Sequence, residues 1–317
     1  MKKLHHINKE DPLWREKWLT KRKEGIGGSD IGAVIGLNLY KSPLMVYLDK
    51  TNQLPEEDEE NIPAELGLEL ESFMSKKFAK WIKKTEGLDI EVKEMPYILQ
   101  HDKIDYFITT LDGYFEHPEK GKCVLEIKTT SEFRREEWKD DKIPDSYYLQ
   151  VQFQLAITGW EYCYLAFLIG NRKFDVKVIE RNEKIIKSLK EKGIEFWTDY
   201  IEKNEPPAPI GIISDNIALE ILFPEEEKGK ILELDIEKEK EIEEFIKKYD
   251  ELKDKIKPLE KEFNTIKQNL KFSMGDSELA IINNRKITFK TISLPERTLK
   301  ACSFRKLYIS KRKNEKR

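Results

Sequence analysis

Two carboxylates and one amine fall at a spacing that can support phosphodiester hydrolysis. Glu126 and Lys128 are separated by one residue within an apolar stretch, and Asp112 lies in the apolar stretch before it. Alternate residues of a strand point to the same face, so Glu126 and Lys128 would stand side by side. Carboxylate oxygens bind Mg²⁺ and leave sites for water and phosphate, with the carbonyl of Ile127 as a further ligand. A lysine can balance the charge that develops on the phosphate. These residues predict a metal-dependent hydrolytic site.

Two paired strands must position these residues. Residues 106–114 and 122–130 are rich in β-branched and aromatic residues, and the polar segment 116–121 between them ends in a glycine. This pattern predicts a β-hairpin that brings Asp112 opposite Glu126. The alternative is a solvated strand face with alternating charges, where ion pairs contribute little.

An Asp followed by Glu-x-Lys on the next strand resembles the PD-(D/E)xK nucleases. That resemblance implies an α/β, restriction-endonuclease-like core, in which helices flank a central mixed sheet. It also implies Mg²⁺ as the cofactor, with Mn²⁺ as a substitute.

The composition sets limits on the class of protein. At 317 residues, with 39% hydrophobic and 37% charged residues, the chain is long enough for one large or two small domains. No apolar run approaches a membrane span, and three cysteines without metal-ligand spacing fit a reduced cytoplasm and argue against an iron–sulfur cluster. A net charge of −3 requires any DNA site to be a local basic surface.

A glycine-rich segment near the N-terminus precedes an apolar helix. Residues 25–30 read Gly-Ile-Gly-Gly-Ser-Asp, and Arg22 comes shortly before them. A turn that opens a helix N-terminus can bind an anion through its free N–H groups. The simpler interpretation is that Ser29 or Asp30 caps the helix. The segment is not a P-loop, because no Gly-Lys-Ser/Thr follows.

The residues from Arg22 through the glycine-rich segment to Ser42-Pro43 resemble the opening of the YqaJ-type viral recombinase family, the lambda-exonuclease-like phage nucleases. The resemblance implies that this segment binds the 5′-terminal phosphate of DNA. By position, Arg22 and Ser29 would line that pocket. Lys23 is the alternative to Arg22, because the spacing to the first glycine is one residue longer than in the best-known relative.

A predicted helix from residue 67 to about residue 84 supplies a further candidate. The sequence Gly-Leu-Glu-Leu-Glu at residues 67–71 resembles the family's helix that donates one more active-site carboxylate, to the metal or to catalysis. The resemblance assigns this role to Glu71, with Glu69 as the alternative. Without the resemblance, either residue would be read as a surface glutamate.

A second helix is predicted from Asp145 to about Thr158. Tyr147, Gln150 and Gln154 share one of its faces. Residues 150–152 read Gln-Val-Gln and resemble the family's QxQ motif, which implies that Gln150 contacts the attacking water or the scissile phosphate. Tyr147 and Gln154 would then be DNA contacts.

The remaining chain suggests a second module. Strands at 162–169 and 173–179 and a helix at 182–203 would complete a nuclease domain of residues 1–205, and a proline-rich break opens a linker over 206–230. Residues 231–317 would hold a helix with a heptad-like seam, interrupted by Pro258, then a small β-hairpin and a basic tail. The seam would pair with another helix or with another copy of the chain.

The family resemblance implies a 5′→3′ exonuclease that acts on double-stranded DNA ends in the cytoplasm and leaves 3′ single strands for an annealing protein. Two alternatives remain open from the residues. One is a structure-specific or restriction-type endonuclease of the same fold. The other is a catalytically decayed DNA-binding or scaffold protein that uses its coiled segment and basic tail.

Overall fold

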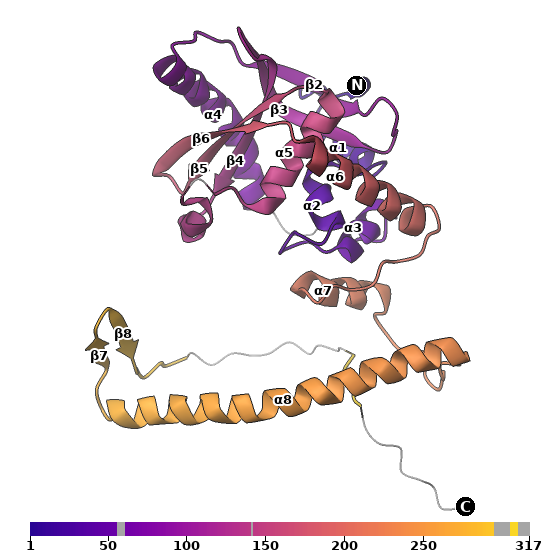
Figure 1. Ribbon diagram of the computed structural model, residues 1–317, viewed down its shortest axis with the longest axis vertical. Helices are drawn as coiled ribbons and strands as arrows, with labels where there is room; N and C mark the ends of the chain where they lie inside the picture. Colours follow the sequence, from indigo (N-terminus) through magenta and orange to yellow (C-terminus); the bar gives the residue numbers. More distant parts are fainter. Residues whose placement is uncertain (56–60, 141, 295–304, 310–317) are drawn as a thin grey trace, which may run out of the picture. The chain divides into compact units, whose positions relative to one another are not determined.

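The computed structural model describes residues 1–55, 61–140, 142–294 and 305–309. The chain forms two compact units, Met1–Leu222 and Phe223–Arg317 (Figure 1). Most of the predicted basic tail lies outside the described residues.

A six-stranded mixed sheet forms the centre of the first unit. Its strands follow one another in sequence order, and only β4 and β5 run parallel. The strands are β1 (Lys2–His6), β2 (Lys93–Gln100), β3 (Ile108–His117), β4 (Gly121–Thr130), β5 (Tyr162–Ile169) and β6 (Lys173–Glu180). The predicted α/β core with a central mixed sheet is confirmed, as is the hairpin, which is formed by β3 and β4.

Helices cover both faces of this sheet (Figure 1). The helices of the first unit are α1 (Trp14–Arg22), α2 (Gly28–Val34), α3 (Pro43–Lys50), α4 (Ile62–Glu86), α5 (Asp145–Thr158), α6 (Glu183–Phe196) and α7 (Ile213–Leu222), with a 3₁₀ helix at Glu132–Trp138 and a π-helical turn at Trp197–Ile201. Because side chains alternate along β4, Leu125 packs under α4 with Phe78, whereas Val124 faces the core beneath α5. Glu126 and Lys128 therefore point to the α5 side.

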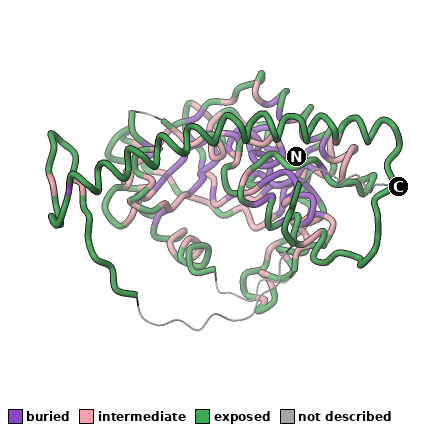
Figure 2. The backbone as a smooth tube through the Cα atoms, turned by 90° about the horizontal axis from the view of Figure 1, so that it is seen from below, coloured by how far each residue is buried: buried purple, intermediate pink, exposed green. Residues whose placement is uncertain are grey.

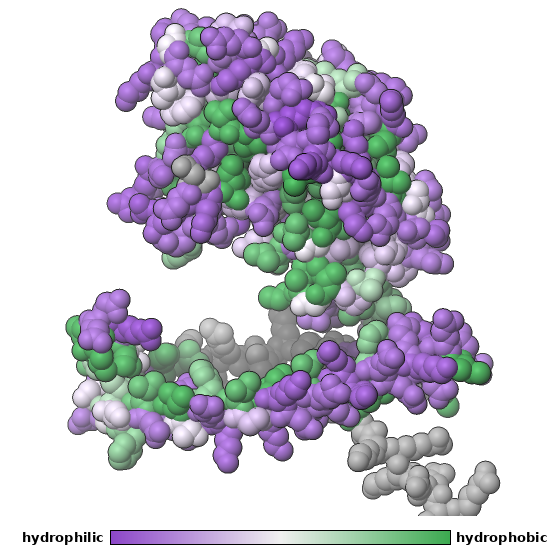
Figure 3. Space-filling model, viewed as in Figure 1, coloured by the Kyte–Doolittle hydropathy of each residue, from purple (hydrophilic) through white to green (hydrophobic). Residues whose placement is uncertain are grey.

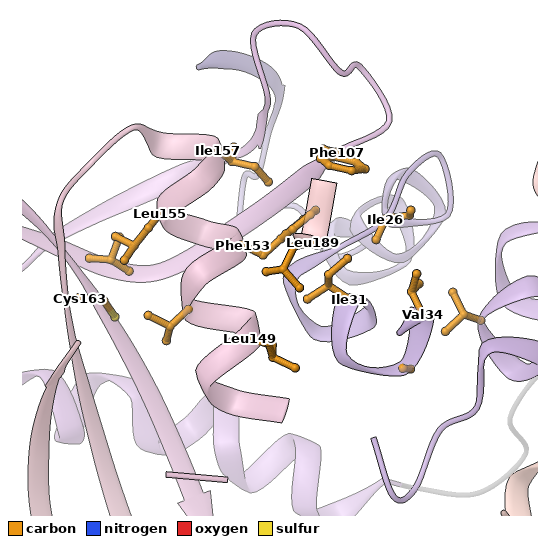
Figure 4. Close-up of a cluster of buried hydrophobic side chains, with 14 of the residues drawn as sticks. Ile26, Ile31, Val34, Phe107, Leu149, Phe153, Leu155, Ile157, Cys163 and Leu189 are labelled. Atoms are coloured by element: carbon orange, nitrogen blue, oxygen red, sulfur yellow. The ribbon is translucent and has the colours of Figure 1, made fainter. Parts of the chain in front are cut away.

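The larger core lies between the sheet and helices α2, α5 and α6. Figure 4 shows Phe153, Leu189 and Ile31 meeting between these helices. Buried residues, drawn in purple in Figure 2, are concentrated in the first unit. This core fixes α2 and α5 relative to the sheet, and both helices carry site residues.

The first unit extends beyond the predicted boundary at residue 205, because α7 falls inside the predicted linker. Asp215 accepts hydrogen bonds from the N–H groups of Ile210, Gly211 and Ile212 at 2.8, 2.8 and 3.1 Å. The hydroxyl of Ser214 accepts one from the N–H of Ser42 at 3.0 Å, at the start of α3. The proline-rich break is therefore followed by a docked helix and not by a free linker.

The second unit contains α8 (Ile236–Met274) and a hairpin of β7 (Leu279–Ile282) and β8 (Arg285–Thr288). The hairpin around residues 283 and 284 was predicted. Pro258 was expected to kink or split this helix, and the split does not occur, since α8 continues through this residue as one helix of 39 residues. A proline inside a helix removes one N–H donor and costs about 3 kcal/mol, which the other hydrogen bonds and contacts of this long helix must offset. Among the described residues, no helix is long and apolar enough to span a membrane.

Candidate active site

The Asp112 carboxylate reaches from β3 to the backbone of β4. The last register pair of this hairpin before the site joins Gly113 to Leu125. One residue further, Asp112 Oδ2 accepts a hydrogen bond from the N–H of Ile127 at 2.7 Å. A side chain thus takes over where the strand pairing stops, and Asp112 lies beside the Glu-x-Lys sequence as expected.

Glu126 is held by three side-chain donors. Its Oε1 lies 2.6 Å from the Lys128 ammonium and accepts a hydrogen bond from the Gln150 amide at 2.6 Å. Its Oε2 accepts one from the Gln154 amide at 2.6 Å. Only 1% of Glu126 is exposed, so these donors replace the water that a carboxylate normally requires.

Gln154 does not occupy the position predicted for it. We expected it to contact DNA, but it is 1% exposed, and its amide also lies 3.3 Å from the carbonyl of Thr110. The i, i+4 spacing of Gln150 and Gln154 puts both amides on one face of α5. That face is pressed against Glu126, so Gln154 is a buried support for the carboxylate.

Burial and neighbouring charges shift the pKa values of Asp112 and Lys128. Burial raises the pKa of Asp112 well above its usual range, and the negative charge of Glu126 raises it further. Burial alone would lower the pKa of Lys128, but Glu126 and Asp112 outweigh it and raise that pKa above its ordinary value. The site therefore contains a lysine that stays protonated and two carboxylates in mutual repulsion.

This donor set suits a hard divalent cation. Asp112 and Glu126 are oxygen donors, and a cation between them would relieve the repulsion that raises the pKa of Asp112. Among the described residues, however, no three His, Cys, Asp or Glu side chains are grouped so that they could hold a metal ion. A set that includes Glu71 therefore remains a prediction.

Glu71 lies on α4 and lines the same cavity as Asp112, Glu126 and Lys128. Its Oε2 is 3.5 Å from the ammonium of Lys9. Burial raises the pKa of Glu71, Lys9 opposes the shift, and Glu126 adds to it. The alternative residue Glu69 is exposed and does not line this cavity, so the geometry favours Glu71 as the helical carboxylate.

Tyr147 packs against the site, near Gln150 as expected, and its role as a DNA contact stays a prediction. Its ring centre is 5.4 Å from the Lys128 ammonium and 5.6 Å from the ring centre of Trp138. An aromatic face attracts a cation, so Tyr147 restricts where the Lys128 side chain can lie.

The predicted phosphate pocket is assembled around Arg22. Its guanidinium donates to the hydroxyl of Ser29 at 2.6 Å and lies 4.6 Å from the ring centre of Trp18. The ammonium of Lys50 donates to the carbonyl of Arg22 at 3.0 Å and pairs with Asp30 at 2.7 Å. Arg22 is thus fixed through both its side chain and its backbone.

The buried carboxylate of Asp30 holds the glycine-rich turn in place through a backbone hydrogen bond. Gly27, and neither Ser29 nor Asp30, is the N-cap of α2, and its N–H donates to Asp30 at 3.1 Å. Burial opposes ionisation, but Lys41, Lys50 and Arg22 lower the pKa of Asp30 below its usual range. The Ser29 hydroxyl is therefore left to contact Arg22.

One cavity of about 720 Å³ joins the two groups of residues. Its lining includes Asp112, Glu126, Lys128 and Gln150 together with Arg22 and Ser29. This volume falls in the range of small-ligand pockets. The carboxylates and the guanidinium therefore line one shared space.

The sequence interpretation missed two aromatic residues of this cavity. Trp14 and Trp18 line it, with ring centres 6.3 Å apart. Their i, i+4 spacing on a basic helix was the available signal. Lys23, the alternative to Arg22, does not line the cavity.

Comparison with known proteins gives a consistent group of relatives. Residues 17–161 match the model of the YqaJ-like viral recombinase domain. The uncharacterized protein YqaJ of Bacillus subtilis (strain 168) is 31% identical over 293 residues, which cover 92% of this chain and 88% of that protein.

Two exonucleases are among the proteins of known structure to which this chain is similar. An alkaline exonuclease from Laribacter hongkongensis, LHK-Exo, is 20% identical, with a TM-score of 0.46 over 60% of this chain and 97% of that chain. A phage related exonuclease from Haemophilus somnus 129PT is 14% identical, with a TM-score of 0.38 over 57% of this chain and 96% of that chain.

Proposed function

The chain belongs to the family of YqaJ-like viral recombinase domains, and from this premise we propose that it is a Mg²⁺-dependent exonuclease acting on double-stranded DNA. It would remove nucleotides from the 5′ end and leave 3′ single strands, which an annealing protein could bind. The observation that carries the proposal is the single cavity shared by the carboxylate–lysine cluster and the Arg22 pocket.

Asp112 and Glu126, with the carbonyl of Ile127, are the residues that would hold the metal. When bound there, Mg²⁺ supplies Lewis acidity to the scissile phosphate and the attacking water, and Mn²⁺ could substitute for it. Gln150 and Gln154 keep Glu126 in place through its two oxygens. The carboxylate would therefore meet the metal without a large rearrangement of α5.

Lys128 would act as a fixed positive charge. Its ammonium already lies 2.6 Å from Glu126 Oε1, so it is placed to donate a hydrogen bond to a phosphate oxygen beside the carboxylates. A donor in place before the reaction stabilises the charge that develops in the transition state. Tyr147 limits its movement.

Arg22 and Ser29 would bind the 5′-terminal phosphate. The guanidinium and hydroxyl are already in contact, and the N-terminus of a helix adds donors for an anion. Binding the end at one side of the cavity would place the next phosphodiester bond near Lys128. This arrangement supports an exonuclease over an endonuclease.

The test is digestion of three duplexes in Mg²⁺: a linear duplex labelled at the 5′ ends, the same duplex labelled at the 3′ ends, and a covalently closed circle. We expect early release of the 5′ label, late release of the 3′ label and an intact circle. Early loss of the 3′ label would reverse the proposed polarity. Cleavage of the circle at a similar rate would establish an endonuclease instead.

A further inference from the structure

In the second unit, α8 exposes a continuous apolar seam. Its members alternate by steps of three and four residues, and those from Phe245 onward are 45% to 66% exposed. The seam consists of Ile242, Phe245, Tyr249, Leu252, Ile256, Leu259, Phe263, Ile266 and Leu270. In Figure 3, hydrophobic residues of this helix are visible at the surface among charged ones. Such a heptad pattern is typical of a helix that packs against another helix.

Nothing in the described part of the second unit covers this seam. Within the 39 residues of α8, only Met274 is buried, and α8 is the only helix among residues 223–294 and 305–309. Helices in water are stabilised mainly by packing an amphipathic face, so a helix of this length needs a partner.

We propose that the partner is α8 of a second copy of this chain, in an antiparallel two-stranded coiled coil. The two-fold axis would pass between Lys257 and Pro258. In this register Ile256 of one copy faces Leu259 of the other. The inference does not depend on the proposed nuclease activity.

The sizes of the seam residues favour this antiparallel register. Each aromatic residue then faces an aliphatic one on the other copy: Phe245 faces Leu270, Tyr249 faces Ile266, and Phe263 faces Leu252. In a parallel pair, each of these aromatic residues would face its own copy. Alternating large and smaller side chains fills the space between two helices more evenly than three aromatic layers.

The charges beside the seam favour the same register. Lys253 faces Glu260 of the other copy, and Lys255 faces Glu262, each twice by symmetry. Residues at these flanking positions select the orientation and register of coiled coils.

Other registers bring like charges together. In a parallel pair, Lys255 meets Glu260 and Glu262 meets Lys267, but Lys248 meets Lys253, whereas the antiparallel register contains no like-charged pair. A shift of one heptad in either direction from the antiparallel register sets Lys253 against Lys267, or Lys255 against its own copy.

Cysteine cross-linking of the full chain tests the orientation. Ile242→Cys is made in one copy and Ser273→Cys in another copy of different size, so that the mixed product can be recognised. Both copies also carry Cys302→Ser, and the other two native cysteines are buried. In the proposed dimer, residue 242 of one copy meets residue 273 of the other. The two positions are about 46 Å apart along one helix, so the mixture should cross-link while each variant alone should not. Cross-linking of either variant alone, or none in the mixture, would overturn the proposal.

Charge reversal tests the register. Lys253→Glu with Lys255→Glu, or Glu260→Lys with Glu262→Lys, should weaken self-association in sedimentation by on the order of tenfold or more. Mixing the two variants should restore it, because every pair becomes attractive again. The matched control, Lys247→Glu with Lys261→Glu, changes the same charge on the opposite face of α8 and should have little effect.

Several results would contradict the register. If the control weakens association equally, or mixing does not restore it, the flanking charges do not form these pairs. If sedimentation of the wild-type chain shows no self-association through α8, the seam is covered instead by its own chain or by a different protein.

Discussion

Arg22 is fixed from two sides, by the ring of Trp18 and the hydroxyl of Ser29. If this guanidinium binds the terminal phosphate, 5′-phosphorylated duplex should be degraded faster than 5′-hydroxyl duplex. Arg22→Ala should remove most of that preference. Trp18→Ala should reduce it and Trp18→Phe should largely retain it, because an aromatic face still holds the cation.

The measurement is the ratio of initial rates on the two ends for each variant. A change at Leu19, which is exposed on the same helix, serves as the control and should keep the wild-type ratio. Equal rates on both ends with the unmodified protein would show that the Arg22–Ser29 contact is only structural.

Metal binding should depend on pH through Asp112. Its pKa is raised by burial and by Glu126, so Asp112 keeps its proton to a higher pH than an ordinary aspartate, and a metal must displace that proton. Raising the pH removes that proton, and the affinity for Mg²⁺ should rise with it. Titration calorimetry in two buffers of different ionisation enthalpy should detect proton release, which Asp112→Asn should remove. An affinity that is independent of pH would contradict this assignment.

At the residue scale, the sequence predicted contacts that follow from local geometry. The Lys128–Glu126 pair follows from the alternation of side chains along a strand. The position of Asp112 opposite Glu126 follows from the hairpin. The donors from α5 could not be placed in this way, because their positions depend on how that helix crosses the sheet. For the same reason Gln154 was assigned to DNA. Trp18 was missed because the i, i+4 spacing of Trp14 and Trp18 on α1 was not used.

Helix α6 packs so closely on Phe107 that it requires a glycine. A Cβ atom at Gly193 would lie 2.6 Å from Cζ of Phe107, a ring that is fully buried. Alanine normally stabilises a helix interior relative to glycine. Here Gly193→Ala should destabilise the protein by about 1–3 kcal/mol through overpacking.

Chemical denaturation measures this free energy of unfolding. Ser188→Ala, at an exposed position of the same helix, is the control and should leave stability unchanged or slightly higher. An increase in stability for Gly193→Ala would show that the ring of Phe107 can move aside.

At the element scale, long periodic segments were predictable and non-local pairings were not. The hairpin of β3 and β4 has its turn in the sequence. Strand β1 is short and polar, and it pairs with β2, which lies about 90 residues away. Helix α7 follows a proline-rich segment that indicated a linker, and only its contact with α3 reveals that it belongs to the first unit.

The boundary of the first unit can be tested with two truncations. A chain ending at Leu222 keeps α7 and should fold and retain metal-dependent cleavage of short duplex. A chain ending at Pro207 loses the contacts of Ser214 and Asp215 and should unfold at a lower temperature. If both behave alike, α7 does not contribute to the first unit.

The residues after Leu222 should matter most for long duplex. The segment 298–317 holds eight Lys and Arg residues and one acid, and contacts of such residues with phosphates weaken steeply with salt. The chain ending at Leu222 should therefore lose affinity for long duplex, most clearly at moderate salt. A full loss of cleavage on short duplex would show that the second unit is needed for catalysis itself.

The most direct test of the nuclease site is cleavage of a linear duplex in Mg²⁺ and in EDTA by the wild-type chain and by site variants. We expect cleavage only in Mg²⁺. Asp112→Asn and Glu126→Gln should reduce it to background, and Lys128→Ala should reduce it by about 10²-fold, while all three still bind DNA in Ca²⁺. Glu69→Gln, on the exposed side of α4, should cleave normally. Cleavage in EDTA, or near-normal turnover in any of the three site variants, would contradict the assignment of these residues to a metal-dependent nuclease.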